Sequence, residues 1–426
     1  MIKQSTSHCQ NDFLILSLLG IIYLSANNLF YLVPFYRVTN VFYVRDVGNI
    51  LIMVCLFFCI LKYHDLGIFN DVFSFLIFYY ILFVFIQAAF GSLKYEQPLI
   101  VGIIKTRDQL YYLSYFLYVY LLNTDSRINQ FMEFLTIISL FLILLSLINY
   151  FGPEIFYHRW SKEGVSGLRS GIERAFIPGM GILAVSFVWQ FNKTVNLNRL
   201  FNIPMLVSIL LFGGIIFRQT RMLIISSALT AILMIIAKKK YKFMLFFLVL
   251  VSIGTICIGS QMKENILLSP FKSAVEDVNN GTGTWGARLI QMKVDWISFR
   301  QNMLFGSGLS TIRSSVLEKK NPKLAELAYG NDLGYTHWLK YYGITGIIWL
   351  IMVIVLFYRR YFKVKKHLSD GETEILGFAQ YNFFFIVVAT ITQNYFFDSF
   401  RILITCLSLS ILSAHYRFAM KKQSSE

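Results

Sequence analysis

Apolar and polar positions alternate in long blocks along this chain. Apolar runs of about 16 to 22 residues, the length that crosses a bilayer as a helix, recur from Phe13 almost to the C-terminal end. The strict residue-by-residue alternation that a membrane β-barrel needs is absent. Because a backbone in lipid must satisfy its own hydrogen bonds, the pattern predicts an all-α, polytopic integral membrane protein.

The blocks predict about twelve transmembrane helices in one membrane domain that covers residues 1–426. The fourth block is the weakest, because it is short, rich in Tyr and charged at its start. The first block lacks a small-residue cleavage site and is expected to stay as a span. The predicted spans are residues 13–33, 46–61, 71–91, 107–122, 131–151, 175–191, 200–217, 222–237, 241–260, 336–358, 375–395 and 400–417.

Short basic segments set the expected orientation. The stretches "KKKYK" (238–242), "RRYFKVKK" (359–366) and "RFAMKK" (417–422) fall on one side of a twelve-span chain. Basic residues in short loops stay in the cytoplasm. Both termini are then cytoplasmic, and the two long polar connections, 152–174 and 261–335, are outer loops.

Composition adds a charge signal to this map. The chain is 56% hydrophobic and 15% charged, yet it carries 39 Lys and Arg against 23 Asp and Glu. Most arginines fall outside or at the outer membrane edge, and their planar forks suit phosphate and carboxylate, so an anionic ligand is expected there. The alternative is that long loops escape the charge rule and lie against anionic headgroups. The five cysteines predict neither a disulfide framework nor a metal site.

Four arginines before or within the central spans are candidates. Arg218 and Arg221 lie in a very short outer turn, "FRQTRMLIISSALTAIL", where ionisable groups are costly and often functional. Arg221 begins a span, whose N-terminal amides favour an anion. Arg169 and Arg174 lie in the Gly-rich loop "YHRWSKEGVSGLRSGIERAFIPGMG" and are candidates for binding substrate. Interfacial anchoring for the first pair, and a solvated loop for the second, remain open.

The long loop 261–335 contains an amphipathic segment, residues 287–299. Leu289, Met292, Trp296 and Phe299 recur at helical spacing, which predicts a helix on the membrane surface or over the spans. We interpret that stripe as packing and assign it no chemistry. Arg288 opens this helix and is a further candidate for binding an anion.

His337 stands where the polar turn "YGNDLGY" gives way to the apolar run "THWLKYYGITG". It is the only one of the six histidines at the outer start of a predicted span, and Asp332 precedes it as a candidate substrate-binding residue. An imidazole ordinarily titrates near pH 6.5, which suits a general base for a sugar hydroxyl. The more common role is a hydrogen-bonded interfacial residue. Gly343 and Gly346 predict close helix packing below it.

Several familiar patterns are missing. The sequence contains no DxD, HExxH, GxSxG or Walker motif, and no cluster with metal-ligand spacing. We therefore expect no metal and no cofactor. A reaction on a donor that is already activated, and carried by a lipid, would need only a base and cations for the leaving phosphate.

The order of these motifs resembles the O-antigen polymerase and O-antigen ligase superfamily of membrane glycosyltransferases. "QTRMLIISSAL", "GARLIQMKVDW", "LFGSG" and "THWLKYYGITGIIWL" carry the resemblance, which covers roughly residues 160–350. It implies a GT-C-like helical fold that transfers a glycan from undecaprenyl pyrophosphate to a sugar hydroxyl. The reaction would occur at the outer face of the bacterial inner membrane.

Carried over by residue, the resemblance implies that Arg221 and Arg288 hold the pyrophosphate and that His337 activates the acceptor hydroxyl. Arg169 or Arg174 would contribute to substrate binding. The implied partners are the lipid-linked glycan, membrane lipids and a chain-length regulator, without nucleic acid. One departure is Trp338, where the family usually has Asn.

Polymerase is favoured over ligase, which differs only in its acceptor, the core sugar of lipid A. A capsular or exopolysaccharide polymerase would have the same features. A twelve-span transporter or flippase is a different class that stays open, as does a non-catalytic scaffold. Against transport, the connection between the sixth and seventh spans is only "NKTVNLNR", residues 192–199.

Overall fold

A computed structural model gives the fold of most of the chain. It describes residues 2–34, 39, 42–63, 66–95, 98–157, 168–169, 172–173, 176–199, 201–218, 220–244, 283–308, 334–367, 373–393 and 395–425. The described chain is helical apart from one antiparallel pair of two-residue strands, β1 (Leu168–Arg169) and β2 (Ile172–Glu173). It divides into two compact units, and the prediction of a single membrane domain stays a prediction.

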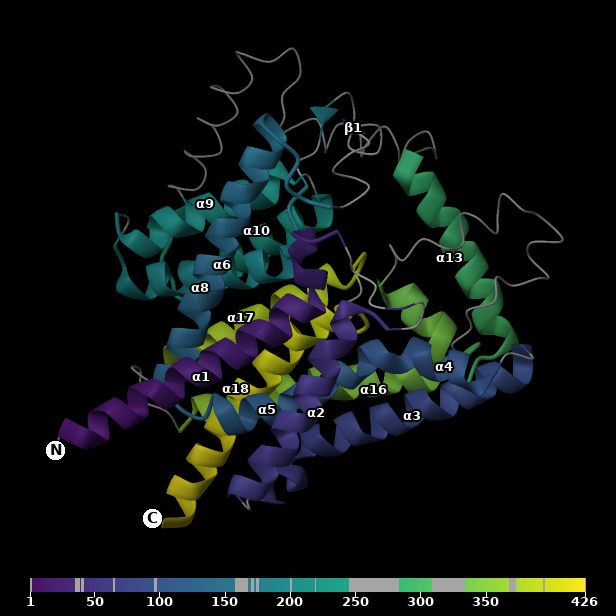
Figure 1. Cartoon of the computed structure of the whole chain (residues 1–426), viewed down its shortest axis with the longest axis horizontal. Helices are drawn as coiled ribbons and strands as arrows, with labels where there is room; N and C mark the ends of the chain where they lie inside the picture. Colours follow the sequence, from purple (N-terminus) through teal and green to yellow (C-terminus); the bar gives the residue numbers. More distant parts are fainter. Residues whose placement is uncertain are drawn as a thin grey trace. The chain divides into compact units, whose positions relative to one another are not determined.

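Unit 1 comprises residues 1–48, 121–276 and 369–385. Its central helix is α8, whose side chains are nearly all buried and which packs against α6, α9 and α10 (Figure 1). Cap residues set two helix starts: Thr124 accepts a hydrogen bond from the Arg127 amide, and Asn202 accepts one from the Met205 amide. The elements are α1 (Ile2–Ala26), η1 (Asn28–Tyr31), α6 (Asp125–Phe151), α8 (Met180–Leu197), α9 (Ile203–Phe217), α10 (Arg221–Ala237) and most of α17 (Thr373–Ala389).

Unit 2 comprises residues 49–120, 277–368 and 386–426. Helices α3 and α16 pack together in it, and α13 packs against α16 (Figure 1). Its elements are most of α2 (Val44–Tyr63), η2 (Leu66–Asn70), α3 (Val72–Tyr95), α4 (Leu99–Thr106), η3 (Arg107–Leu113), α5 (Ser114–Leu121), α13 (Gly283–Gln301), α16 (Gly334–Lys365) and α18 (Ser399–Ser425).

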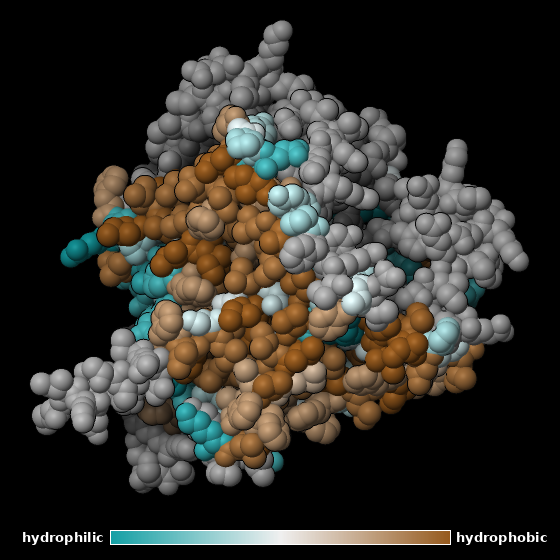
Figure 2. Space-filling model, in the orientation of Figure 1, coloured by the Kyte–Doolittle hydropathy of each residue, from teal (hydrophilic) through white to brown (hydrophobic). Residues whose placement is uncertain are grey.

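Five helices in the described part of the chain, α2, α3, α6, α16 and α18, are long and apolar enough to cross a membrane. Apolar side chains also cover much of the described surface (Figure 2). In water such a surface would be unfavourable, whereas lipid accepts it. These features support a helical, multi-pass membrane protein, while the count of about twelve spans stays a prediction.

Two predicted spans differ from the structure. The first, 13–33, ends as a helix at Ala26, because Asn28 to Tyr31 adopt left-handed backbone angles. The fourth, 107–122, is a composite in which α4 leads through the 3-10 helix η3 into α5. The ninth, 241–260, lies almost entirely outside the described residues.

Candidate functional site

Helix α13 turns a polar face toward the inside of unit 2. Gln291 and Asp295 are buried on it, and Arg288, seven residues before Asp295, is half-buried on the same face. The predicted packing stripe is wrong for three of its four members. Phe299 is buried, but Leu289, Met292 and Trp296 are exposed. The helix is amphipathic as expected, but its buried face carries the polar Gln291 and Asp295 beside the apolar Val294 and Phe299.

The first segment of α16 supplies the groups opposite this face. The Lys340 Nζ lies 3.0 Å from Asp295 Oδ1, and the His337 Nδ1 lies 3.8 Å from Asp295 Oδ2. The Asp295 side chain is 1% exposed and that of His337 is 5% exposed. The His337 ring also packs edge-on against Tyr341, with centroids 4.4 Å apart. We call Asp295, His337 and Lys340 the His337 cluster.

Hydrogen bonding in the His337 cluster is incomplete. Among the described residues, neither oxygen of Asp295 accepts a hydrogen bond, and the buried His337 Nδ1 and Arg288 Nε have no hydrogen-bond partner. The 3.8 Å contact between His337 and Asp295 is too long to be one. Most buried polar atoms in proteins are satisfied, and the unsatisfied atoms on these two facing helices are groups that could bind a ligand.

A break in α16 separates these residues from the rest of that helix. Gly343 has φ 61° and ψ −156°, a conformation that is almost restricted to glycine. The turn 302–308 fills the break. The amides of Ile344 and Thr345 donate to the carbonyls of Met303 and Leu304, and the Ser307 amide donates to the Lys340 carbonyl.

The turn 302–308, which contains Gly306, Ser307 and Gly308, therefore caps both halves of a discontinuous helix. A Cβ on Gly306 would lie 2.4 Å from the Tyr341 backbone, and one on Gly343 would lie 2.5 Å from the Gly306 amide. These glycines allow two backbones to meet, in keeping with the expectation that Gly343 serves close packing. Discontinuous helices in membrane proteins often carry substrate sites.

Trp338 points into an aromatic core rather than into the cluster. It stacks with Tyr80 and Trp349, at centroid distances of 5.4 and 5.6 Å, and is buried. Trp349 in turn donates its indole N–H to the Leu76 carbonyl of α3. The residue after His337 thus has a packing role, which accounts for an indole where the resembling family has Asn.

Arg218 and Arg221 belong to unit 1. Arg221 is the first residue of α10, as predicted, and Arg218 lies over the Phe176 ring at 5.3 Å. Both side chains are half-buried. Their meeting with Arg288 and His337 stays a prediction.

The remaining candidates fall outside the described residues. Arg174 and Asp332 are outside them, and for Arg169 only the backbone, in β1, is described. Their predicted contacts with substrate stay predictions. No group of three or more His, Cys, Asp and Glu side chains in the described ranges is placed to hold a metal ion.

A second charged cluster lies near the other end of α16, also within unit 2. Asp71 forms an ion pair with Arg360 and accepts hydrogen bonds from Tyr115, Ser413 and the Val72 amide. Burial raises the pKa of the Asp71 carboxyl, but Arg360 and these hydroxyl donors outweigh it, so the pKa lies below its usual range. We call Asp71, Tyr115, Arg360 and Ser413 the Asp71 cluster.

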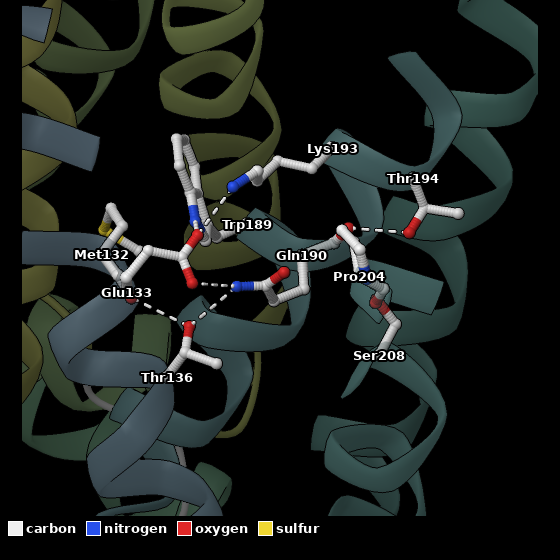
Figure 3. A network of polar contacts seen from close by, with 9 residues as sticks. All are labelled: Met132, Glu133, Thr136, Trp189, Gln190, Lys193, Thr194, Pro204 and Ser208. Atoms are coloured by element: carbon white, nitrogen blue, oxygen red, sulfur yellow. Dashed lines mark hydrogen bonds and ion pairs between the residues drawn. The ribbon is translucent and has the colours of Figure 1, made fainter. Parts of the chain in front are cut away.

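Unit 1 has a third polar group around Glu133 of α6 (Figure 3). The carboxylate accepts hydrogen bonds from the Trp189 indole, the Gln190 amide and Lys193 Nζ, at 3.0, 2.9 and 2.8 Å. Gln190 also reaches Thr136, at 3.3 Å. Both carboxylate oxygens are occupied, so this group fastens α6 to α8.

Sequence reasoning missed Asp295 and Lys340. The signal was present, because Arg288, Gln291 and Asp295 follow the i, i+3, i+7 spacing of one helix face, and Lys340 is one turn beyond His337. The apolar stripe of the same segment led to the packing interpretation, so this polar spacing was overlooked.

The His337 cluster combines a base with a charged partner. A carboxylate beside an imidazole can fix its tautomer and stabilise the imidazolium that forms when it takes a proton. Lys340 and Arg288 add positive charge on the same two helices, with Arg288 about 10 Å along α13 from Asp295. Such a site can deprotonate a hydroxyl beside an anionic group.

Comparison of the sequence with protein-family models gives no match, and comparison with curated proteins gives none that is significant.

Proposed function

We propose that this protein is a metal-independent glycosyltransferase that acts on lipid-linked glycans at the outer face of the bacterial inner membrane. The favoured form is a polymerase of O-antigen or other surface-polysaccharide repeat units, with undecaprenyl pyrophosphate as the carrier. The observation that carries the proposal is the His337 cluster, a buried histidine and a lysine that both contact one buried carboxylate, at the N-terminal end of a helix long and apolar enough to cross a membrane. The predicted topology puts that end outside.

The proposed step is a displacement at the anomeric carbon of the donor. The acceptor hydroxyl oxygen forms the new bond to that carbon, while the bond to the pyrophosphate oxygen breaks and its electrons leave with undecaprenyl pyrophosphate. His337 takes the hydroxyl proton. Arg288, with Arg221 as predicted from sequence, would stabilise the leaving pyrophosphate, and a base of this kind contributes about 10²- to 10⁴-fold in rate.

Asp295 and Lys340 have supporting roles in this proposal. The Asp295 carboxylate would hold the imidazole and stabilise its protonated form, while Lys340 neutralises Asp295 before the proton arrives. Neither residue needs to touch the sugar. This arrangement is supported by the near-complete burial of Asp295 and by its contacts with the His337 ring and the Lys340 ammonium.

The test is the glycan profile of a strain in which the gene is deleted and then complemented. The native chain should restore long polymer, while His337→Gln should leave single repeat units on lipid A with membrane protein levels unchanged. Normal chain length with His337→Gln would remove the histidine from the mechanism. Long chains left on carrier lipid in the deletion strain would instead identify a ligase.

A transporter is the second candidate, and the broken helix α16 favours it, since transporters build substrate sites at such breaks. The two are separable with purified protein in vesicles. A transferase makes longer glycan from donor and acceptor on the same side, whereas a flippase moves the donor across the bilayer without extending it.

A further inference from the structure

The outer face of α13 and the turn that follows it form an exposed apolar surface. On α13 the exposed apolar side chains are Leu289, Met292, Trp296 and Ile297, and on the turn they are Met303, Leu304 and Phe305. Trp296 is 47% exposed and Leu304 is 63% exposed. We call these seven residues the α13 surface. The α13 members of this set are exposed, whereas Asp295 on the same helix is buried.

This surface continues the lipid-facing side of a membrane helix. The Phe305 ring stacks on Phe90 of α3, with centroids 6.3 Å apart, and both rings are about half exposed. The Gln87 side-chain amide of α3 donates to the Phe305 carbonyl. Gly308 lies so close to α3 that a Cβ there would be 3.1 Å from the Gly91 amide.

These contacts with α3 determine how deep the turn 302–308 lies relative to the apolar span of that helix. Residues 87–91 lie inside the apolar span Val72–Leu93, near its C-terminal end. Met303, Leu304 and Phe305 therefore lie beside membrane-spanning residues. Helix α13 ends at this turn and runs across the direction of α3 instead of along it (Figure 1).

The charges on α13 suit the surface of an anionic membrane. Lys293 and Arg300 are exposed on the same side as Trp296, and the Arg300 guanidinium lies 5.6 Å from the centre of the Trp296 ring. The only acidic residue of α13, Asp295, is buried on the other side. A helix with an apolar face, a tryptophan and flanking basic residues is typical of one that lies in the bilayer interface.

We propose that the α13 surface is inserted among the acyl chains of bilayer phospholipids, with Lys293 and Arg300 at anionic headgroups. Helix α13 then lies between lipid and the His337 cluster, and it holds Asp295 and Arg288 at the depth where lipid headgroups lie. The inference rests on the α13 surface alone and would stand if the transferase proposal failed.

The experiment is a depth measurement by spin labelling in nanodiscs that contain anionic phospholipid. The five native cysteines are replaced, and a single cysteine at Met292, Trp296 or Leu304 carries a nitroxide. A label at Phe90 serves as the lipid reference. A label at Ser126, exposed before Arg127 in the first turn of α6, serves as the water reference.

Labels on the α13 surface should collide more often with oxygen than with a water-soluble nickel reagent, as at Phe90, and should lie about 5–10 Å below the headgroups. Behaviour like that at Ser126 would overturn the proposal. So would exclusion of both reagents, which means that the chain itself covers the surface, or spectral broadening lost on dilution with unlabelled protein, which means that a second copy does.

The headgroup part of the proposal has its own comparison. In nanodiscs of zwitterionic lipid alone, the label at Trp296 should lie shallower than in anionic lipid. The combined substitution Lys293→Gln and Arg300→Gln should abolish that difference. An equal depth in both lipids with the native residues would contradict the role of Lys293 and Arg300. No glycan is used, so this result and that of the transfer assay are independent.

Discussion

The two ends of α16 hold two buried charged clusters that are built differently. In the Asp71 cluster one carboxylate has an ion pair, two hydroxyl donors and a backbone amide. In the His337 cluster the carboxylate of Asp295 has the Lys340 ammonium and the His337 ring as neighbours, and no described residue donates a hydrogen bond to it. In the first arrangement both carboxylate oxygens of Asp71 accept hydrogen bonds. In the second, the buried carboxylate of Asp295 can still accept hydrogen bonds.

We propose that this difference separates a structural role from a functional one. Buried charges are tolerated when hydrogen bonds replace the lost water, and a saturated cluster stabilises the packing around it. Sites that bind or react often violate that rule, and the rest of the fold compensates. We therefore assign stability to the Asp71 cluster and chemistry to the His337 cluster, and the two should respond oppositely to substitution.

The largest effect on stability is expected for Asp71→Asn. Arg360 would then keep its charge in a buried position without a counter-ion, and breaking such a pair costs about 3–5 kcal/mol. Unfolding in mixed micelles measures this loss. The double variant Asp71→Leu with Arg360→Met removes both charges and should recover much of it. Equal destabilisation by the single and double variants would contradict an ion-pair role.

A smaller loss is expected for Gly343→Ala, at the junction between the two ends of the helix. The backbone conformation costs a residue with a Cβ roughly 1–3 kcal/mol, and the added atom would lie 2.5 Å from the Gly306 amide. Gly213→Ala is the matched control, because nothing lies within 4 Å of its added Cβ. If both substitutions changed the unfolding midpoint equally, the tight junction at Gly343 would be refuted.

Acid should weaken the Asp71 cluster. The folded state lowers the pKa of Asp71, so its carboxylate contributes stability above the pKa of the unfolded chain, about 3.9. That contribution is lost as the pH falls through the lower folded value. Native protein should therefore lose stability steeply below about pH 4, and Asp71→Asn should lose less over the same interval. Parallel curves would show that other groups govern acid unfolding.

Much of the fold followed from the sequence, because hydrophobic blocks encode membrane helices directly. The predicted spans 46–61, 71–91, 131–151 and 222–237 match α2, α3, α6 and α10 within a few residues at most ends. The breaks at Asn28 and Gly343 were not predicted, since they depend on tertiary contacts that periodicity does not report. At Gly343 those contacts come from a turn 35 to 40 residues earlier in the chain.

The site was predictable only in part. His337 was singled out because it stands alone at a boundary, and the structure buries it beside Asp295, while its role as a base stays a prediction. Asp295 was missed because a sequence cannot say which face of an amphipathic helix turns inward when the other face meets lipid. In water the apolar stripe of Leu289, Met292 and Trp296 would be buried. Beside a bilayer the exposed face is the apolar one.

The most direct test of the account sets Asp295→Asn against Asp71→Asn, with unfolding and polymer length measured for both. Asp295→Asn should lower the free energy of unfolding by clearly less than Asp71→Asn does, because it loses one ion pair and no hydrogen bond, and it should still abolish long polymer. Asp71→Asn should cause the larger loss in the free energy of unfolding, but each molecule that still folds should make long polymer. Full-length polymer from Asp295→Asn, or a stability loss as large as that of Asp71→Asn, would contradict the assignment of chemistry to the His337 cluster.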